Sequence, residues 1–170
     1  MKFIDLFAGV GGFRLAMERA GHECVWSCEI DKYCRQVYKK HFGDEPYGDI
    51  RTINASDIPD FDILCGGVPC QSWSIAGKRG GFEDDRGTMW FEVFKIVKIK
   101  KPKYLLLENV KGLLSHNEGK SFERICEDIC EMGYAIDFRV LNSKYVIPQN
   151  RERVFILARR LDTLTEKEIV

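Results

Sequence analysis

Residues 3–12 read Phe3-Ile4-Asp5-Leu6-Phe7-Ala8-Gly9-Val10-Gly11-Gly12. An apolar run of strand character passes directly into a glycine-rich turn, and residues 13–20 continue as a helix-like segment. A second strand candidate over residues 23–29 completes a strand-helix-strand unit. Glycines in such a turn let the backbone approach a ligand at the N-terminus of the helix. The start of the chain therefore predicts an α/β fold with a ligand site at its first turn.

The same alternation of short apolar runs and helix-like stretches continues along the chain. Ile63-Leu64-Cys65 and Leu105-Leu106-Leu107 are continuously apolar, which is typical of strands covered by helices on both faces. Residues 135–141 and 154–159 are strand candidates with no room for a crossover helix between them, so we expect them to pair antiparallel. We predict a mostly parallel, doubly wound α/β sheet with an antiparallel C-terminal strand pair. The remaining expected elements are strands at 61–65, at 104–108 and, more weakly, ending near Ile50, and helices at 32–41, 88–100 and 120–132.

The bulk composition is that of one soluble globular domain. The chain has 170 residues, 45% of them hydrophobic and 31% charged, and no linker or repeat divides it. No run approaches the roughly 20 apolar residues of a membrane span, and Asp5 comes too early for a signal peptide. We therefore expect a cytoplasmic protein without a membrane partner. The 26 basic and 26 acidic residues balance, so net charge alone does not indicate a nucleic-acid partner.

The seven cysteines lie mostly within apolar runs, which favours reduced, buried thiols over a disulfide framework. Cys24 and Cys28 are four residues apart, as are Cys126 and Cys130, whereas zinc sites commonly use tighter Cys-x-x-Cys pairs. We therefore expect no metal site.

The glycine turn and two acids indicate a site for an adenosine ligand. A dinucleotide fingerprint would place a third glycine where Arg14 stands, which weakens the case for a bound pyrophosphate. Glu29 closes the second strand, where sheets of this type place an acid to hydrogen-bond ribose hydroxyls. Asp49 could accept from an adenine amino group while Ile50 packs on the ring. Glycine turns in α/β proteins are also often purely structural, and that alternative stays open.

A cysteine follows the next strong strand, in Gly66-Gly67-Val68-Pro69-Cys70-Gln71-Ser72-Trp73-Ser74. Cys70 is expected just beyond a strand's carboxyl edge, where open α/β sheets place their active sites. Pro69 stiffens the backbone there, and a thiol is a good nucleophile once it is deprotonated. The alternative is that Cys70 is a small core residue, as most isolated cysteines are.

Glu108 and the segment Gln149-Asn150-Arg151-Glu152-Arg153 supply further candidate residues. Glu108 ends a strand of leucines, at the same edge of the sheet, where burial would favour its protonated form. Such a carboxyl could hydrogen-bond a ring nitrogen and activate an electron-poor heterocycle toward thiolate addition, or it could simply cap the next loop. Arg151 and Arg153 alternate on an extended segment and so point the same way, toward a base carbonyl, a phosphate or a carboxylate. A solvated strand end is the alternative for both arginines.

Four segments, taken in order, resemble the motifs of the DNA cytosine-5 methyltransferase family, and together they span essentially the whole chain. They are residues 5–12, residues 67–71, Glu108-Asn109-Val110 and residues 149–153. The resemblance implies a Rossmann-like, S-adenosylmethionine-dependent methyltransferase, with double-stranded DNA as its partner and a restriction-modification system as a plausible setting. Trp73 stands where the family more often has phenylalanine, an aromatic exchange that leaves the chemistry intact.

By this resemblance, Cys70 adds to C6 of a cytosine flipped out of the helix, and Glu108 contacts N3. Arg151 and Arg153 hold the base and the catalytic assembly. C5 takes the methyl group of S-adenosylmethionine, and loss of the C5 proton with release of Cys70 completes turnover. Residues 72–87 are expected to form a mobile loop that closes over DNA. The residues expected to contact DNA are Gln71, Ser72 and Ser74, and those expected to bind the cofactor are Phe7, Ala8, Gly9, Gly11, Gly12, Glu29, Ile30, Asp49, Ile50 and Pro69.

The resemblance also implies that residues 1–170 are an incomplete catalytic, S-adenosylmethionine-binding domain. The family continues with a target-recognition region and then completes the cofactor pocket and the sheet. A C-terminal half or second subunit is therefore an expected partner. Thr165-Glu166-Lys167-Glu168, a capping-box pattern that opens a helix just before the sequence stops, agrees with this expectation. The alternatives are a cytosine-5 methyltransferase of tRNA, a truncated or split chain that binds cofactor or a partner without turnover, and, more distantly, a nicotinamide-dependent oxidoreductase.

Overall fold

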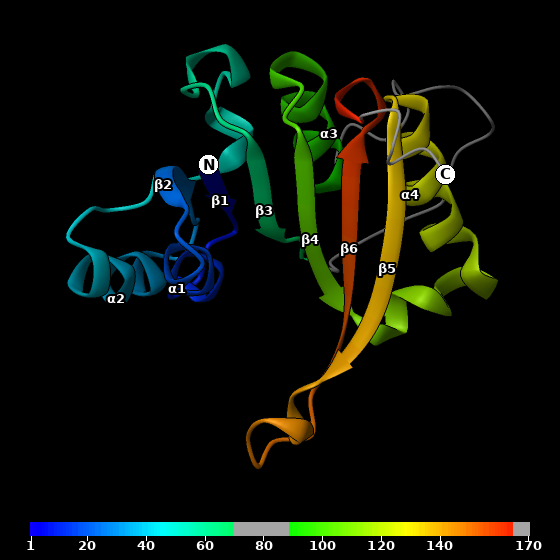
Figure 1. Cartoon of the computed structure of the whole chain (residues 1–170). Coiled ribbons are helices and arrows are strands. Elements are labelled where there is room, and N and C mark those ends of the chain that lie inside the picture. The colour runs from blue at the N-terminus through cyan, green and yellow to red at the C-terminus, as the bar shows by residue number, and fades with distance from the viewer. Residues whose placement is uncertain (70–88, 165–170) are drawn as a thin grey trace.

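The computed structural model describes residues 1–69 and 89–164, and in this part of the chain it forms one sheet with helices on both faces (Figure 1). The strands are β1 (Lys2–Leu6), β2 (Glu23–Cys28), β3 (Ile63–Gly67), β4 (Tyr104–Val110), β5 (Tyr134–Asn142) and β6 (Glu152–Arg160). The helices are α1 (Gly12–Arg19), α2 (Lys32–Phe42), α3 (Met89–Lys100) and α4 (Lys120–Glu131), with short 3-10 turns between several of them.

The sheet has six strands in the order β2-β1-β3-β4-β6-β5. β1 pairs in parallel with both β2 and β3, and β3 pairs in parallel with β4. β6 runs antiparallel to β4 and to β5. The predicted doubly wound sheet with an antiparallel C-terminal pair is confirmed. The carboxyl ends of the parallel strands therefore meet at one edge, on either side of the point where strand order reverses at β1.

The expected weak strand ending near Ile50 is wrong. Tyr47 makes only an isolated bridge to Cys28, and Ile50–Thr52 is a 3-10 turn. The Asp49 side chain accepts a hydrogen bond from the Arg51 amide at 3.0 Å, which closes the backbone into a turn. Pro46 also lacks the N–H that a strand ladder needs at this point.

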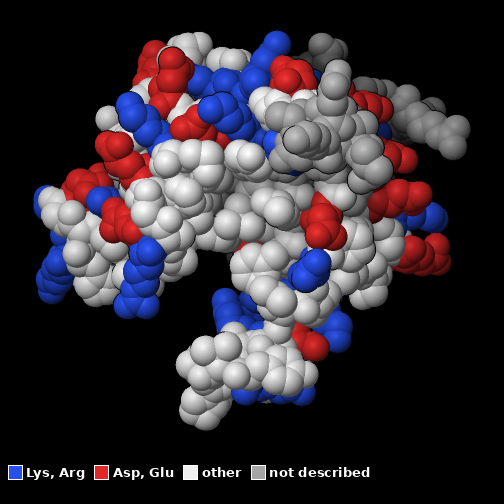
Figure 2. Space-filling view, viewed as in Figure 1, with Lys and Arg blue, Asp and Glu red and all other residues white. Residues whose placement is uncertain are grey.

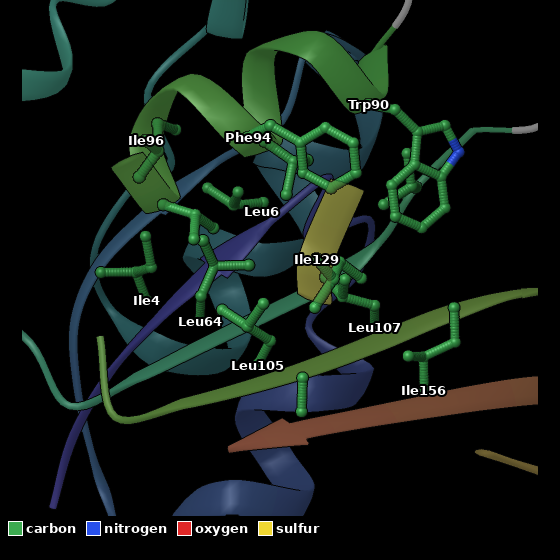
Figure 3. Close-up of a cluster of buried hydrophobic side chains, with 14 of the residues drawn as sticks. Ile4, Leu6, Leu64, Trp90, Phe94, Ile96, Leu105, Leu107, Ile129 and Ile156 are labelled. Carbon is green, nitrogen blue, oxygen red and sulfur yellow. The ribbon is translucent and has the colours of Figure 1, made fainter. Parts of the chain in front are cut away.

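Two hydrophobic clusters hold the helices against the sheet. The larger one packs α3 and α4 on one face, where Ile4, Leu64 and Leu105 are fully buried (Figure 3). The smaller one packs Phe13 and Met17 of α1 against the opposite face. On the same face as α1, the β4-β6-β5 end of the sheet is less covered, and Leu157 of β6 is 49% exposed. This face of the sheet is therefore covered by a helix near β1 and β3 and is partly exposed near β6.

The six cysteines in the described part of the chain are all free thiols. Burial raises the pKa of Cys65 and Cys28, as expected for inert structural thiols. Within residues 1–69 and 89–164, no cluster of three His, Cys, Asp or Glu side chains is arranged to hold a metal ion. No helix in the same ranges is long and apolar enough to cross a membrane.

Candidate functional site

The glycine turn between β1 and α1 is built from left-handed backbone conformations. Phe7, Gly9 and Gly11 have φ angles of 53°, 55° and 93°. A Cβ added at Gly9 or Gly12 would meet nothing within 4 Å, so this side of the turn is open to an approaching ligand. A Cβ at Gly11 would lie 2.2 Å from the Phe42 ring of α2. A glycine is therefore needed at position 11 because α2 packs against it. The family resemblance had instead predicted that Gly11 contacts the cofactor.

Glu29 is fixed between the glycine turn and α2 by two backbone amides. Its Oε2 accepts from the Gly9 N–H at 2.8 Å, and its Oε1 accepts from the Asp31 N–H at 2.8 Å. Charge-assisted bonds of this kind are stronger than neutral ones. The carboxylate is therefore held at the carboxyl end of β2, the place predicted for an acid that binds ribose hydroxyls.

Asp49 and Ile50 lie at the start of the 3-10 turn that replaced the expected strand. Hydrogen bonds from the Arg51 side chain and amide hold the pKa of Asp49 below its ordinary value, so this carboxylate is ionised at neutral pH. Ile50 is buried. Asp49 thus supplies a hydrogen-bond acceptor held in place by Arg51, and the adjacent Ile50 supplies an apolar side chain.

A pocket of about 290 Å³ joins these elements at the carboxyl edge of the sheet. Six predicted cofactor-binding residues line it, whereas Ala8, Gly9, Gly11 and Gly12 do not. Cys28, Gly48, Arg51 and Met89 also line the pocket, and sequence reasoning did not select them. The six predicted residues are Phe7, Glu29, Ile30, Asp49, Ile50 and Pro69.

The nucleophile candidate Cys70 and the predicted DNA-contacting residues Gln71, Ser72 and Ser74 lie outside the described residues. So does the predicted mobile loop at 72–87. The chain is described up to Pro69, which lines the pocket and directly precedes Cys70.

Glu108 lies at the same edge, in register with Gly67 of β3 and Phe155 of β6. Its Oε1 is 2.9 Å from Nε of Arg153, and the two side chains are only 20% and 22% exposed. A Cβ at Gly67 would lie 3.3 Å from Glu108 Oε2, so the carboxylate rests beside the backbone that leads to Cys70. Burial of Glu108 is therefore partial, and its carboxyl group has an ion-pair partner, Arg153, that the sequence alone did not predict.

The two arginines of the 149–153 segment separate in the structure. Arg153 is part of β6 and forms the ion pair with Glu108. Arg151 precedes β6 and is exposed, and its backbone amide donates to Asn142 Oδ1 at 3.2 Å. Only Arg153 is therefore brought to the carboxylate.

Comparison with known proteins identifies the family. The profile of the C-5 cytosine-specific DNA methylases matches residues 1–169. The chain belongs to this family.

The curated relatives of this DNA methylase chain are bacterial Type II methyltransferases. M.HhaI of Haemophilus parahaemolyticus is 51% identical over 163 residues, which are 95% of this chain and 50% of M.HhaI. M.NgoBI of Neisseria gonorrhoeae is 52% identical over 157 residues, 92% of this chain and 50% of the relative. Among solved structures, the S. pombe Dnmt2 methyltransferase matches with a TM-score of 0.77 at 25% identity, over 95% of this chain and 51% of that one. The chain spans about half the length of the curated relatives it matches.

Arg14 of the methylase chain has a structural role that its position did not reveal. It is buried, and its guanidinium donates to Asp44 at 2.7 Å, Glu18 at 2.8 Å and Tyr38 at 3.3 Å. These bonds join α1 to α2 and to the loop that follows α2. The spacing of Arg14 and Glu18 on one helix was a visible signal, whereas its contact with Asp44 comes from the fold.

Asp5 was also missed as a special residue. It is fully buried, and neither of its carboxyl oxygens has a hydrogen-bond partner among the described residues. Burial raises the pKa of Asp5 to about 8. An acid in the middle of an otherwise apolar strand was the available signal.

Proposed function

We propose that this chain is the cofactor-binding and nucleophilic part of a DNA cytosine-5 methyltransferase, acting through a covalent bond between Cys70 and C6 of a flipped cytosine. One observation carries the proposal. Pro69 lines the adenosine-type pocket and directly precedes Cys70, while Glu108 rests beside Gly67 on the adjoining strand. The pocket and the Glu108–Arg153 pair therefore lie on either side of the Gly67–Pro69 segment, which directly precedes Cys70 in the sequence.

The pocket fits S-adenosylmethionine by the chemistry of its lining. Glu29 and Asp49 are acceptors for the ribose hydroxyls and the adenine amino group, and both are already held by hydrogen bonds. Phe7, Ile50 and Pro69 supply apolar contact for the adenine ring. When bound there, S-adenosylmethionine supplies an electrophilic methyl group.

The chain's own residues would activate the cytosine. The Cys70 thiolate forms the S–C6 bond, and the electron pair of the C5–C6 double bond makes C5 nucleophilic. A protonated Glu108 carboxyl donates a hydrogen bond to N3 and so stabilises the charge that develops on the ring, while Arg153 binds Oε1 and holds the Glu108 side chain in place. After C5 is methylated, C5 loses its proton and the S–C6 bond breaks, which restores the thiolate and the ring double bond.

DNA is the proposed macromolecular partner. Figure 2 shows a hollow between the body of the molecule and the tip of the β5–β6 hairpin, with Lys and Arg side chains on the hairpin side of it. The exposed Arg139 and Arg151 belong to this hairpin and suit contact with phosphates. Gln71, Ser72 and Ser74 are proposed to contact the DNA strand around the flipped base. Since the relatives are about twice as long, target recognition is assigned to a C-terminal half or second subunit.

The test is transfer of a tritiated methyl group from S-adenosylmethionine to mixed-sequence duplex DNA and, in parallel, to tRNA. We expect label in DNA, at C5 of cytosine, and none when Cys70 is replaced by Ser. Label in tRNA alone would replace DNA by RNA as the substrate. Label retained in the Cys70→Ser variant would contradict the mechanism.

A second candidate function rests on the pocket alone, whose acceptors and apolar groups suit the cofactor whether or not a methyl group is transferred. In this candidate the chain binds the cofactor, or a partner chain, without turnover. Calorimetry with S-adenosylmethionine separates the two candidates. Binding together with methyl transfer supports the enzyme, and binding without transfer in the chain and in any longer natural form of it supports the second candidate.

A further inference from the structure

Asn109 is a buried polar residue that neither the pocket nor the Glu108–Arg153 pair uses. It follows Glu108 in β4 and is 2% exposed. Successive strand residues point to opposite faces, so Asn109 shares a face with Leu105 and Leu107, on the α3 and α4 side. Glu108 points to the other face. Asn109 therefore does not face the group that Glu108 would contact.

Both ends of the Asn109 side-chain amide bind backbone groups, one on the segment after β3 and one on β4. Its Nδ2 donates to the Val68 carbonyl at 3.0 Å, and its Oδ1 accepts from the Val110 N–H at 2.8 Å. The second bond fixes which way the amide points. The Val68 N–H in turn donates to the Glu108 carbonyl at 3.1 Å. Both backbone polar groups of Val68 are thus bound by the end of β4.

The hydrogen bonds of Val68 are important because the next residue, Pro69, cannot donate one. Pro69 has no N–H, so it cannot extend the ladder between β3 and β4. Val68 is consequently the last residue before Cys70 whose N–H could pair with β4. Without Asn109, a buried carbonyl would lose its partner at the point where the chain turns toward Cys70.

We propose that Asn109 is a positioning residue for the reaction: it holds the backbone of Val68, two residues before Cys70 in the sequence. This inference rests on the proposed function, in which Cys70 is the nucleophile. It assigns Asn109 no contact with cofactor or base. It also explains why an amide, which donates and accepts at once, stands beside Glu108.

The test compares Asn109→Ala with Asn54→Ala, which removes another backbone-binding asparagine, the one that accepts from the Ser56 amide at 3.2 Å. Hydrogen exchange at the Val68 amide is measured in both variants. We expect exchange to become about tenfold faster or more in Asn109→Ala and to stay unchanged in Asn54→Ala. Unchanged exchange at Val68, or an equal acceleration over all strands, would overturn the proposal.

Asn109→Asp provides a variant of nearly the same shape. The introduced carboxylate cannot donate to the Val68 carbonyl, but a protonated carboxyl can. Protection of the Val68 amide, relative to the unmodified chain at the same pH, should therefore recover as pH falls from about 8 to about 5. The alanine variant should show no such recovery. Equal pH profiles for the two variants would count against the hydrogen bond as the cause.

The chemical consequence is read from adduct formation with 5-fluorocytosine DNA. The experiment includes S-adenosylmethionine as the methyl donor. Once C5 is methylated, its fluorine cannot leave as a proton does, so the S–C6 bond to Cys70 stays trapped. We expect Asn109→Ala to form adduct about tenfold more slowly or worse, with cofactor affinity within about twofold. Adduct formation at the unmodified rate would refute the positioning role. Failure of the unmodified chain to form any adduct would instead count against the proposed function, and hydrogen exchange would still decide whether Asn109 holds Val68.

Discussion

The two halves of the sheet's carboxyl edge are built differently. On the β1–β2 side, Glu29 is held by two backbone amides and Asp49 caps its own turn, and helices cover the strands. On the β4–β6 side, Glu108 has one ion-pair partner, Arg153, and farther along β6 the side chain of Leu157, in register with Leu106, is 49% exposed. Local backbone contacts complete the β1–β2 side, which is the proposed cofactor half. The β4–β6 side, the proposed substrate half, is less covered, which suits the proposed binding of a large partner there.

The largest expected effect falls on the substrate half. Cys70→Ser should lower methyl transfer at least about a thousandfold, because a serine hydroxyl is far less ionised at neutral pH than a thiol. Cofactor affinity should stay within about twofold, since the pocket residues are unchanged. Methyl transfer and calorimetry on the same preparation measure both values. An equal loss of methyl transfer and of cofactor affinity would mean that Cys70 also contributes to cofactor binding.

A second comparison sets Glu108 against Glu152, an exposed glutamate that pairs with Lys111 at 3.0 Å. Glu108→Gln should lower the rate of methyl transfer about a hundredfold, because the glutamine lacks the carboxyl that Glu108 is proposed to present to N3. Glu152→Gln should change the rate less than about twofold, as exposed ion pairs contribute little. A similar loss of methyl transfer in both variants would show that the Glu108–Arg153 ion pair contributes only to the stability of the fold.

Glycine positions test the cofactor half. Gly11→Ala should lower the free energy of unfolding by about 1–3 kcal/mol, because its Cβ would meet the Phe42 ring and its φ is +93°. Gly12→Ala, the first residue of α1, should change stability by less than about 1 kcal/mol. Urea unfolding measures both. A stable Gly11→Ala variant would contradict the packing explanation.

The last comparison concerns Asp5, and it is made on stability as a function of pH. Its folded-state pKa of about 8 lies above the ordinary value of 3.8, so the contribution of Asp5 to the stability of the fold is greatest below about pH 4 and is lost as pH rises toward 8. Asp5→Asn should remove that loss, and the gap between the two proteins should shift by at least about 1 kcal/mol between pH 5 and pH 8 in favour of the variant. Urea midpoints at the two pH values measure it. A constant gap would show that Asp5 does not titrate in this range.

Local patterns were enough to predict the sheet, because buried parallel strands are continuously apolar and the glycine turn has a fixed place after β1. They also placed Glu29 and Glu108 at strand ends. The turn at Ile50 was missed, since the capping bond of Asp49 outweighed the weak strand signal. Contacts between distant segments could not be predicted: Gly11 packs on Phe42, Arg14 reaches Asp44, and Asn109 reaches Val68. Each depends on which helices and strands become neighbours.

The most direct test of the central claim is to locate the covalent bond. The chain, and any longer natural form of it, is incubated with S-adenosylmethionine and duplex DNA that contains 5-fluorocytosine, and the modified peptide is identified by mass spectrometry. We predict one adduct, on Cys70, that is absent in Cys70→Ser and retained in Cys65→Ser. No adduct in either form, or an adduct on another cysteine, would contradict it.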